Sequence, residues 1–168
     1  MNTTRLLSAV AMAAALALSP ALAADKAQDF VDKAAIAGTF EVESSELALR
    51  MSKDADVKKF ADTMIADHGQ ANVELEMVAR EQGLTVPTKL DGKHAALIEE
   101  LEKAGAQFDA PYIKAQLDGH AEAVKMFQQY ADNGDNQALQ TFAVKTLPTL
   151  RMHLDMIEQL GDRVGATR

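Results

Sequence analysis

The 168-residue sequence has no cysteine and no tryptophan, and only two tyrosines and six phenylalanines. Without cysteine the chain cannot form disulfides, thiolate metal sites or a thiol nucleophile, so packing and any bound ion must stabilise the fold. Aromatic residues, which favour strands, are scarce, whereas alanine, leucine and methionine are plentiful. This composition favours an all-helical fold.

Long apolar runs are also missing, except at the start of the chain. Arg5 precedes an apolar run of about 13 residues, 6–18, which is shorter than the about 20 residues that a spanning helix needs. The small-x-small cleavage pattern of residues 21–23 follows it. We therefore predict a signal peptide over residues 1–23, cleaved after Ala23. The rest, 24–168, is then a single helical-bundle domain exported to the periplasm, without an integral membrane segment.

Positive charge is sparse, with 17 basic residues against 25 acidic ones and a formal net charge of −8. Loss of Arg5 with the signal peptide would leave about −9. Nucleic acids and anionic membranes bind clustered Lys and Arg, so neither is expected as a partner. A homo-oligomer or a protein partner in the cell envelope is compatible with this acidic chain.

Apolar residues recur at steps of three and four in several segments, the pattern of amphipathic helices. The expected helices cover about residues 25–51, 54–82, 91–103, 109–131 and 136–160. Gly83 is placed for a left-handed helix end, Asp109 for an N-cap and Pro148 for a kink, while Gly161 begins a frayed tail. Short connections make the first two long helices antiparallel, and likewise the last two. The sequence therefore predicts an antiparallel four-helix bundle with an additional short helix between the second and third long helices.

Each long helix carries one titratable residue in its apolar stripe. These residues are Glu41, His68, His120 and His153. Buried carboxylates and imidazoles are costly without partners, so each other, water or a cation must satisfy them. At ~1.5 Å per residue, the two members of each helix pair lie within about one turn of the same level. Three imidazoles and a carboxylate suit Zn²⁺, Cu²⁺ or Fe²⁺, so we predict one transition-metal ion bound by all four residues.

The alternative is a metal-free hydrogen-bond network of the same four residues, or an arrangement in which some of the histidines point outward. Asp67, and also Glu122 or Asp155, are candidates to orient the ligands from behind, or are surface charges. Glycines also lie near three of the four polar positions, which indicates either close backbone approach at a metal site or ordinary tight packing. They are Gly38, Gly69 and Gly119. The remaining histidine, His94, is expected to face solvent.

Signals of catalysis are weak, and we predict no catalytic residues. Di-iron bundle proteins use Glu-x-x-His on two helices. The residues three positions before the three core histidines are instead Ile65, Leu117 and Leu150. The sequence also has no serine triad context, no glycine-rich phosphate loop and no nucleophile elbow. The methionines at helical spacing are better explained as core residues than as copper ligands.

Several short motifs carry a family resemblance. They are residues 30–31, 41–43 and 57–61, Met64-Ile65-Ala66-Asp67-His68, residues 84–87, 108–109, Tyr112 and His120, and residues 145–153. Over nearly the whole mature chain they resemble the exported bacterial domain-of-unknown-function family four-one-four-two, often labelled predicted outer-membrane proteins. The resemblance implies a ferritin-like bundle with Glu41, Asp67, His68, His120 and His153 as motif positions, and it implies no established activity.

The leading hypothesis is therefore a periplasmic helical bundle that binds one transition-metal ion for storage, buffering or envelope stress protection. The second is a metal-free structural or interaction module of the cell envelope, in which the polar residues fix the register of the helices. A redox enzyme with an open coordination position is the least favoured, because the Glu-x-x-His pairs are missing.

Overall fold

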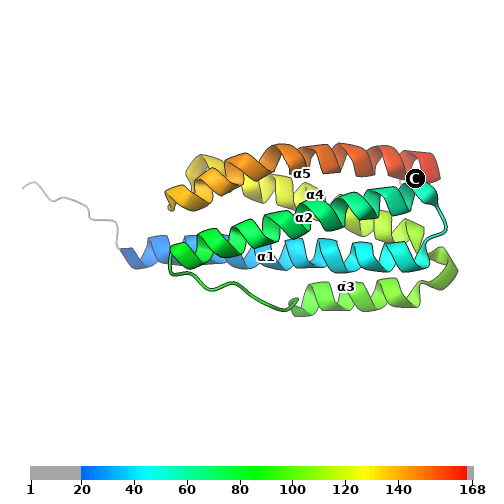
Figure 1. Cartoon of the computed structure of the whole chain (residues 1–168), viewed down its shortest axis with the longest axis horizontal. Helices are drawn as coiled ribbons and strands as arrows, with labels where there is room; N and C mark the ends of the chain where they lie inside the picture. Colours follow the sequence, from blue (N-terminus) through cyan, green and yellow to red (C-terminus); the bar gives the residue numbers. More distant parts are fainter. Residues whose placement is uncertain (1–19, 166–168) are drawn as a thin grey trace, which may run out of the picture.

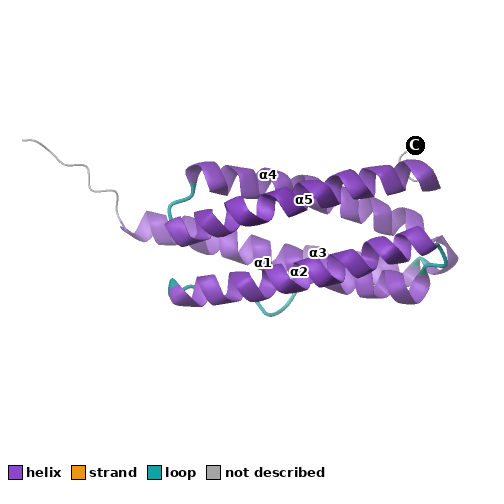
Figure 2. Ribbon diagram, turned by 45° about the horizontal axis from the view of Figure 1, so that its top comes forward, coloured by secondary structure: helices purple, strands orange, loops and turns teal. Residues whose placement is uncertain are grey.

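The computed structural model describes residues 20–165, with side chains from residue 26 onward. Its helices are α1 (Pro20–Met51), α2 (Ala55–Glu81), α3 (Gly92–Lys103), the 3₁₀ turn η1 (Gly105–Gln107), α4 (Asp109–Asn133) and α5 (Gln137–Val164). Within this part of the chain there is no strand, so the all-α prediction is confirmed (Figure 2). Residues 1–19 of the predicted signal peptide lie outside the described residues, and cleavage after Ala23 stays a prediction.

The four long helices form a ring in which α1 packs on α2, α2 on α5, α5 on α4, and α4 on α1. Helices α1 and α5 run in one direction and α2 and α4 in the other (Figure 1). Every neighbouring pair in the ring is therefore antiparallel, as predicted. None of the described helices is both long enough and apolar enough to cross a membrane.

Helix α3 connects the two halves of the bundle. It lies outside the ring against α1 (Figure 1), and only Leu101 of this helix is buried. With 12 residues it covers ~18 Å, which helps to return the chain along the bundle after α2. Helix α4 therefore starts at the same end as α2 and runs parallel to it, diagonally across the core. This return determines the levels at which side chains of α2 and α4 meet.

Side-chain caps fix the starts of three helices. Asp54, Asp91 and Asn136 each accept hydrogen bonds from backbone N–H groups in the first turn of α2, α3 and α5. At the end of α2, Gly83 has a φ of 72°, which confirms the predicted left-handed helix end. Local chemistry alone therefore explains where these helices begin and where α2 ends.

Two predicted helix ends are wrong. Asp109 is the first residue of α4 and not its N-cap, because the cap position belongs to Phe108, which is buried and stacked on Tyr112. The predicted fraying at Gly161 is also wrong, since Gly161 is buried and α5 continues to Val164. In both places packing against the core determines the helix end. Helix α5 runs through Pro148, and the kink there stays a prediction.

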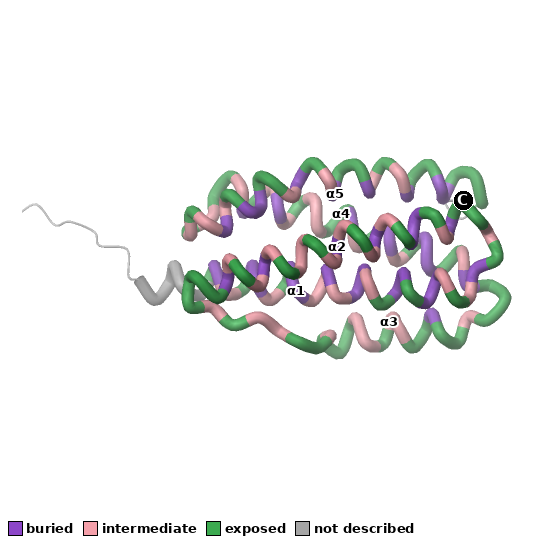
Figure 3. Tube along the Cα trace, viewed as in Figure 1, coloured by how far each residue is buried: buried purple, intermediate pink, exposed green. Residues whose placement is uncertain are grey.

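The core consists of two apolar clusters, one toward each end of the bundle. The first includes Phe30, Leu75, Phe127, Phe142 and Leu150. The second includes Phe60, Met64, Tyr112, Ile113, Ile157 and Leu160. Figure 3 shows the buried residues along the inward faces of the helices. On α2, His68 falls between Met64 and Leu75, so a polar layer separates the two clusters.

Candidate metal centre

Three histidines from three helices meet in this polar layer. They are His68 on α2, His120 on α4 and His153 on α5, and all three are buried. One ring nitrogen of each lies within 4.8 Å of those of the other two. The ring centroids are 5.3 to 5.4 Å apart. The inward orientation is confirmed for all three, and this three-histidine cluster could hold a metal ion.

The hydrogen bond of His120 determines its tautomer. Nδ1 lies 2.9 Å from the backbone carbonyl oxygen of Gln116, one turn earlier in α4. A carbonyl only accepts hydrogen bonds, so Nδ1 must carry the proton. Burial lowers the pKa of His120 to about 4, outweighing the bond to Gln116, which raises it. At neutral pH the ring is therefore neutral, and Nε2 presents a lone pair, as a metal ligand must.

His153 is oriented in the same way by a carboxylate on another helix. Its Nε2 lies 2.9 Å from Oδ2 of Asp67 on α2, so Nε2–H donates to the carboxylate. Burial lowers the pKa of His153, and Asp67 opposes this shift. The neutral ring then has an unprotonated Nδ1, which is buried and has no hydrogen-bond partner. A buried lone pair without a partner is costly, and a metal ion would satisfy it.

His68 completes the cluster. Its Nε2 lies 3.4 Å from Nε2 of His120. Burial lowers the pKa of His68 well below its usual value, and the two neighbouring imidazoles add to the effect. All three rings are therefore neutral at neutral pH, and adding a proton to the cluster is unfavourable. Without an ion, His68 Nε2–H donates to the lone pair of His120 Nε2. A metal ion that displaced this proton would meet a nitrogen lone pair on each of the three rings.

The spacing of the nitrogens suits a first-row transition metal. Zn–N bonds of 2.0–2.1 Å in a tetrahedral site place two ligand nitrogens about 3.3 Å apart. His68 Nε2 and His120 Nε2, at 3.4 Å, already have this separation. The third nitrogen lies within 4.8 Å of both, so tetrahedral binding requires the histidines to draw closer together.

Glu41 lies beside the three-histidine cluster but is not among its converging atoms. Its Oε1 is 3.8 Å from His120 Nδ1, the nitrogen that already bonds Gln116, and its Oε2 is buried without a partner. Burial raises the pKa of Glu41 to about 8, although the Gln116 side chain lowers it in part. At neutral pH without a metal, the carboxyl group is therefore mostly protonated. Its role as a fourth ligand stays a prediction.

The glycines near the site divide into two kinds. A Cβ at Gly119 would lie 2.9 Å from Glu41 Oε1, and one at Gly38 would lie 2.0 Å from Asn72 Oδ1. These two glycines make space for side chains of facing helices, which fits either alternative, a metal site or ordinary tight packing. Gly69 has open space around it, so the close-approach prediction is wrong at that position.

Of the three acidic residues considered as orienting groups, one contacts the cluster and two do not. Asp67 contacts a core histidine, whereas Glu122 and Asp155 are exposed, and Glu122 pairs with Lys93 instead. The prediction that His94 faces solvent is wrong. Its side chain is only 20% exposed, because it bonds Asp91 and packs against Phe40.

Sequence reasoning did not assign a role to the polar residues next to the cluster. Gln116 donates from Nε2 to Ser44 Oγ at 3.0 Å, and Ser45 Oγ lies 2.9 Å from the hydroxyl of Tyr112. Both interactions are buried and join α1 to α4. The signal was present, because Gln116 and the two serines occupy apolar-stripe positions, as Glu41 does.

The family model described as "Domain of unknown function (DUF4142)" matches residues 11–160, which include every residue of the centre. No curated protein and no solved structure matches the chain. The motif-based resemblance is therefore confirmed at the level of the family, and the protein belongs to the DUF4142 domain family.

Proposed function

We propose that this chain is an exported, periplasmic protein that binds one Zn, Cu or Fe ion through the three-histidine cluster. Its role is then metal buffering or protection against envelope stress. Glu41 supplies negative charge at the site, either as a fourth ligand after rotation of its side chain or as a neighbouring carboxylate. The N-terminal sequence pattern supports export. The buried three-histidine cluster supports metal binding.

One observation carries the metal proposal. His120 and His153 each commit one ring nitrogen to an acceptor outside the cluster, Gln116 O and Asp67 Oδ2, and each keeps the other nitrogen unprotonated. This is the arrangement by which proteins orient imidazoles that bind metals. A histidine network formed only for packing would not need a buried Nδ1 without a partner.

The second candidate is a metal-free envelope module, and a specific observation favours it too. The polar layer contains side-chain contacts that can hold the helices in register without an ion, namely His68–His120, Gln116–Ser44 and Ser45–Tyr112. In this case divalent metals and chelators should leave the melting temperature unchanged, whereas a bound ion raises it by mass action.

Metal analysis of the protein recovered from the periplasm distinguishes the two candidates. The full chain is expressed in a bacterium, fractionated and purified without added metal, and its metal content is measured by mass spectrometry. We expect about one equivalent of a transition metal, retained on dialysis, since three imidazole ligands bind such ions tightly.

The matched variants are His68→Gln and His120→Gln, with His94→Gln as the control outside the cluster. The two core variants should lose the metal while the control retains it. A folded wild type that holds no metal, gains no thermal stability from Zn²⁺, Cu²⁺ or Fe²⁺, and resembles its core variants would contradict the proposal. Recovery of the chain only from the cytoplasm would contradict the proposed location.

A further inference from the structure

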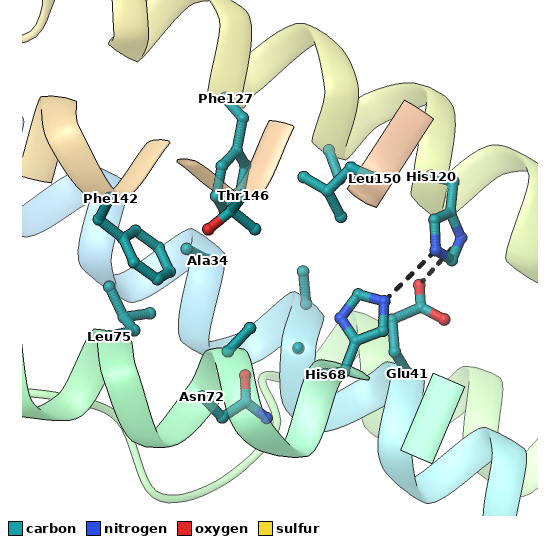
Figure 4. Close-up of a pocket in the computed structure, with 14 residues that line it drawn as sticks. Ala34, Glu41, His68, Asn72, Leu75, His120, Phe127, Phe142, Thr146 and Leu150 are labelled. Carbon is teal, nitrogen blue, oxygen red and sulfur yellow. Dashed lines mark hydrogen bonds and ion pairs between the residues drawn. The ribbon is translucent and has the colours of Figure 1, made fainter. Parts of the chain in front are cut away.

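A small cavity lies beside the three-histidine cluster, between α1, α2, α4 and α5. Its volume is about 30 Å³. Figure 4 shows His68, His120 and Glu41 together at one end of it and Leu75 and Phe142 at the other. His153 does not line the cavity. The cavity therefore meets the cluster on the side of His68 and His120, away from the third histidine.

Small side chains create this cavity in the middle of the core. Its walls include Ala34, Ala37, Gly38, Ala71 and Ala123. Ala71 and Ala123 each lie three residues after a cluster histidine, at the positions nearest to it in the cavity wall on α2 and α4. Protein interiors seldom keep such space, because an empty void forfeits packing contacts. A larger aliphatic residue at Ala71 or Ala123 would occupy part of this space.

The size and walls of the cavity limit what it can hold. A water needs about 10–15 Å³ measured in this way, so the cavity has room for about two waters or one diatomic molecule. Its remaining walls are Leu and Phe side chains with two polar residues, Asn72 and Thr146. Among the described residues that line it there is no Lys or Arg, so an anion would find no countercharge in the protein.

We infer that a metal held by the three-histidine cluster keeps one coordination position open to this cavity, and that a neutral diatomic ligand occupies it. This inference rests on the proposed metal binding and names the ligand class of the same site. Histidine-bound ions often keep one such position for an external ligand, and can expand from four ligands to five. The open position is available whether Glu41 binds the ion or stays beside it. The step is reversible coordination only, with no transfer of electrons.

Nitric oxide binding to the Fe²⁺-loaded protein tests this inference. Fe²⁺ content is first measured anaerobically, and nitric oxide is then titrated while the visible and electron paramagnetic resonance spectra of the adduct are recorded. The cavity-filling variant is Ala123→Leu, and the control is Ala121→Leu, an exposed position on the same helix. A smaller change, Ala71→Val with the exposed control Ala66→Val, repeats the test in case the leucine variant does not fold.

We expect the wild type and both controls to form one adduct per iron. The larger side chain takes the space that the ligand needs, so the cavity variants should bind nitric oxide at least about tenfold more weakly while retaining Fe²⁺. Unchanged nitric oxide affinity in the cavity variants overturns the inference. A wild type that binds Zn²⁺ but no Fe²⁺, or Fe²⁺ but no nitric oxide, overturns it and leaves the metal site standing, whereas no metal binding at all overturns both.

Discussion

Asp67 on α2 and His153 on α5 are joined by a hydrogen bond of 2.9 Å between Oδ2 and Nε2, across 86 residues of sequence. The Asp67 side chain is 38% exposed, whereas that of His153 is 1% exposed. The carboxylate therefore lies at the edge of the core and holds a buried imidazole in one orientation. This contact fixes which nitrogen of His153 is free to bind an ion.

Replacing Asp67 by alanine should weaken metal binding without removing a ligand. Loss of a carboxylate that orients a ligand histidine typically lowers metal affinity by about 10–100-fold. Competition with a chelating dye measures the change. The control is Asp62→Ala, which removes an exposed carboxylate from the same helix. Equal affinities in both variants would show that Asp67 does not orient a ligand.

Glu41→Gln should change how the stability of the metal-free protein depends on pH. The pKa of Glu41 is raised from 4.5 to about 8, so between these values the unfolded chain releases a proton that the folded protein keeps. The wild type therefore loses stability as pH rises through this window, by as much as about 4 kcal/mol, and the variant does not. The lowered histidine pKa values act in the opposite direction, as pH falls below 6.5, but affect both proteins alike.

Urea unfolding at several pH values between 5 and 8 tests this. The readout is the difference in the free energy of unfolding between the variant and the wild type. The stability of the variant relative to the wild type should increase steadily as pH rises. A difference that stays constant over the whole range would mean that Glu41 is ionised in the folded protein, in conflict with its burial.

Gly69→Ala and Gly119→Ala form a matched pair of helix-interior substitutions. Alanine is about 1 kcal/mol more favourable than glycine within a helix, so Gly69→Ala, which meets open space, should stabilise the protein by about that amount. Gly119→Ala should gain none of it, because the new Cβ displaces the Glu41 carboxyl group. Thermal unfolding compares them. Equal stabilisation by both would show that Glu41 is not held against α4.

Much of the fold could be predicted because the determinants are local. The apolar stripes indicate where the helices lie. Asp54 and Gly83 indicate where α2 begins and ends, and the predictions made from them are confirmed. The errors occur where packing decides. Asp109 resembles an N-cap in sequence, but the buried ring of Phe108 takes that position, and α5 passes Gly161 because that residue packs in the core.

The candidate centre was predictable only in part. One titratable residue in each apolar stripe identified Glu41 and the three histidines as buried, since such a position faces the core. The convergence of the three histidines depends on α3, whose return along the bundle makes α4 parallel to α2, and no local pattern encodes that path. The orientation of Glu41 toward Nδ1 of His120 depends on the space left by Gly119, which is a contact between two helices.

X-ray absorption spectroscopy of the Zn²⁺-loaded protein tests the central claim most directly, because it counts the imidazoles bound to the ion. The account predicts one tightly held Zn²⁺ with three imidazole nitrogens at about 2.0–2.1 Å and one or two further light ligands. The spectrum should lose one imidazole in His153→Gln and none in His94→Gln. A spectrum with fewer than two imidazoles, or a change on substitution of His94 alone, would contradict a metal centre in the bundle core.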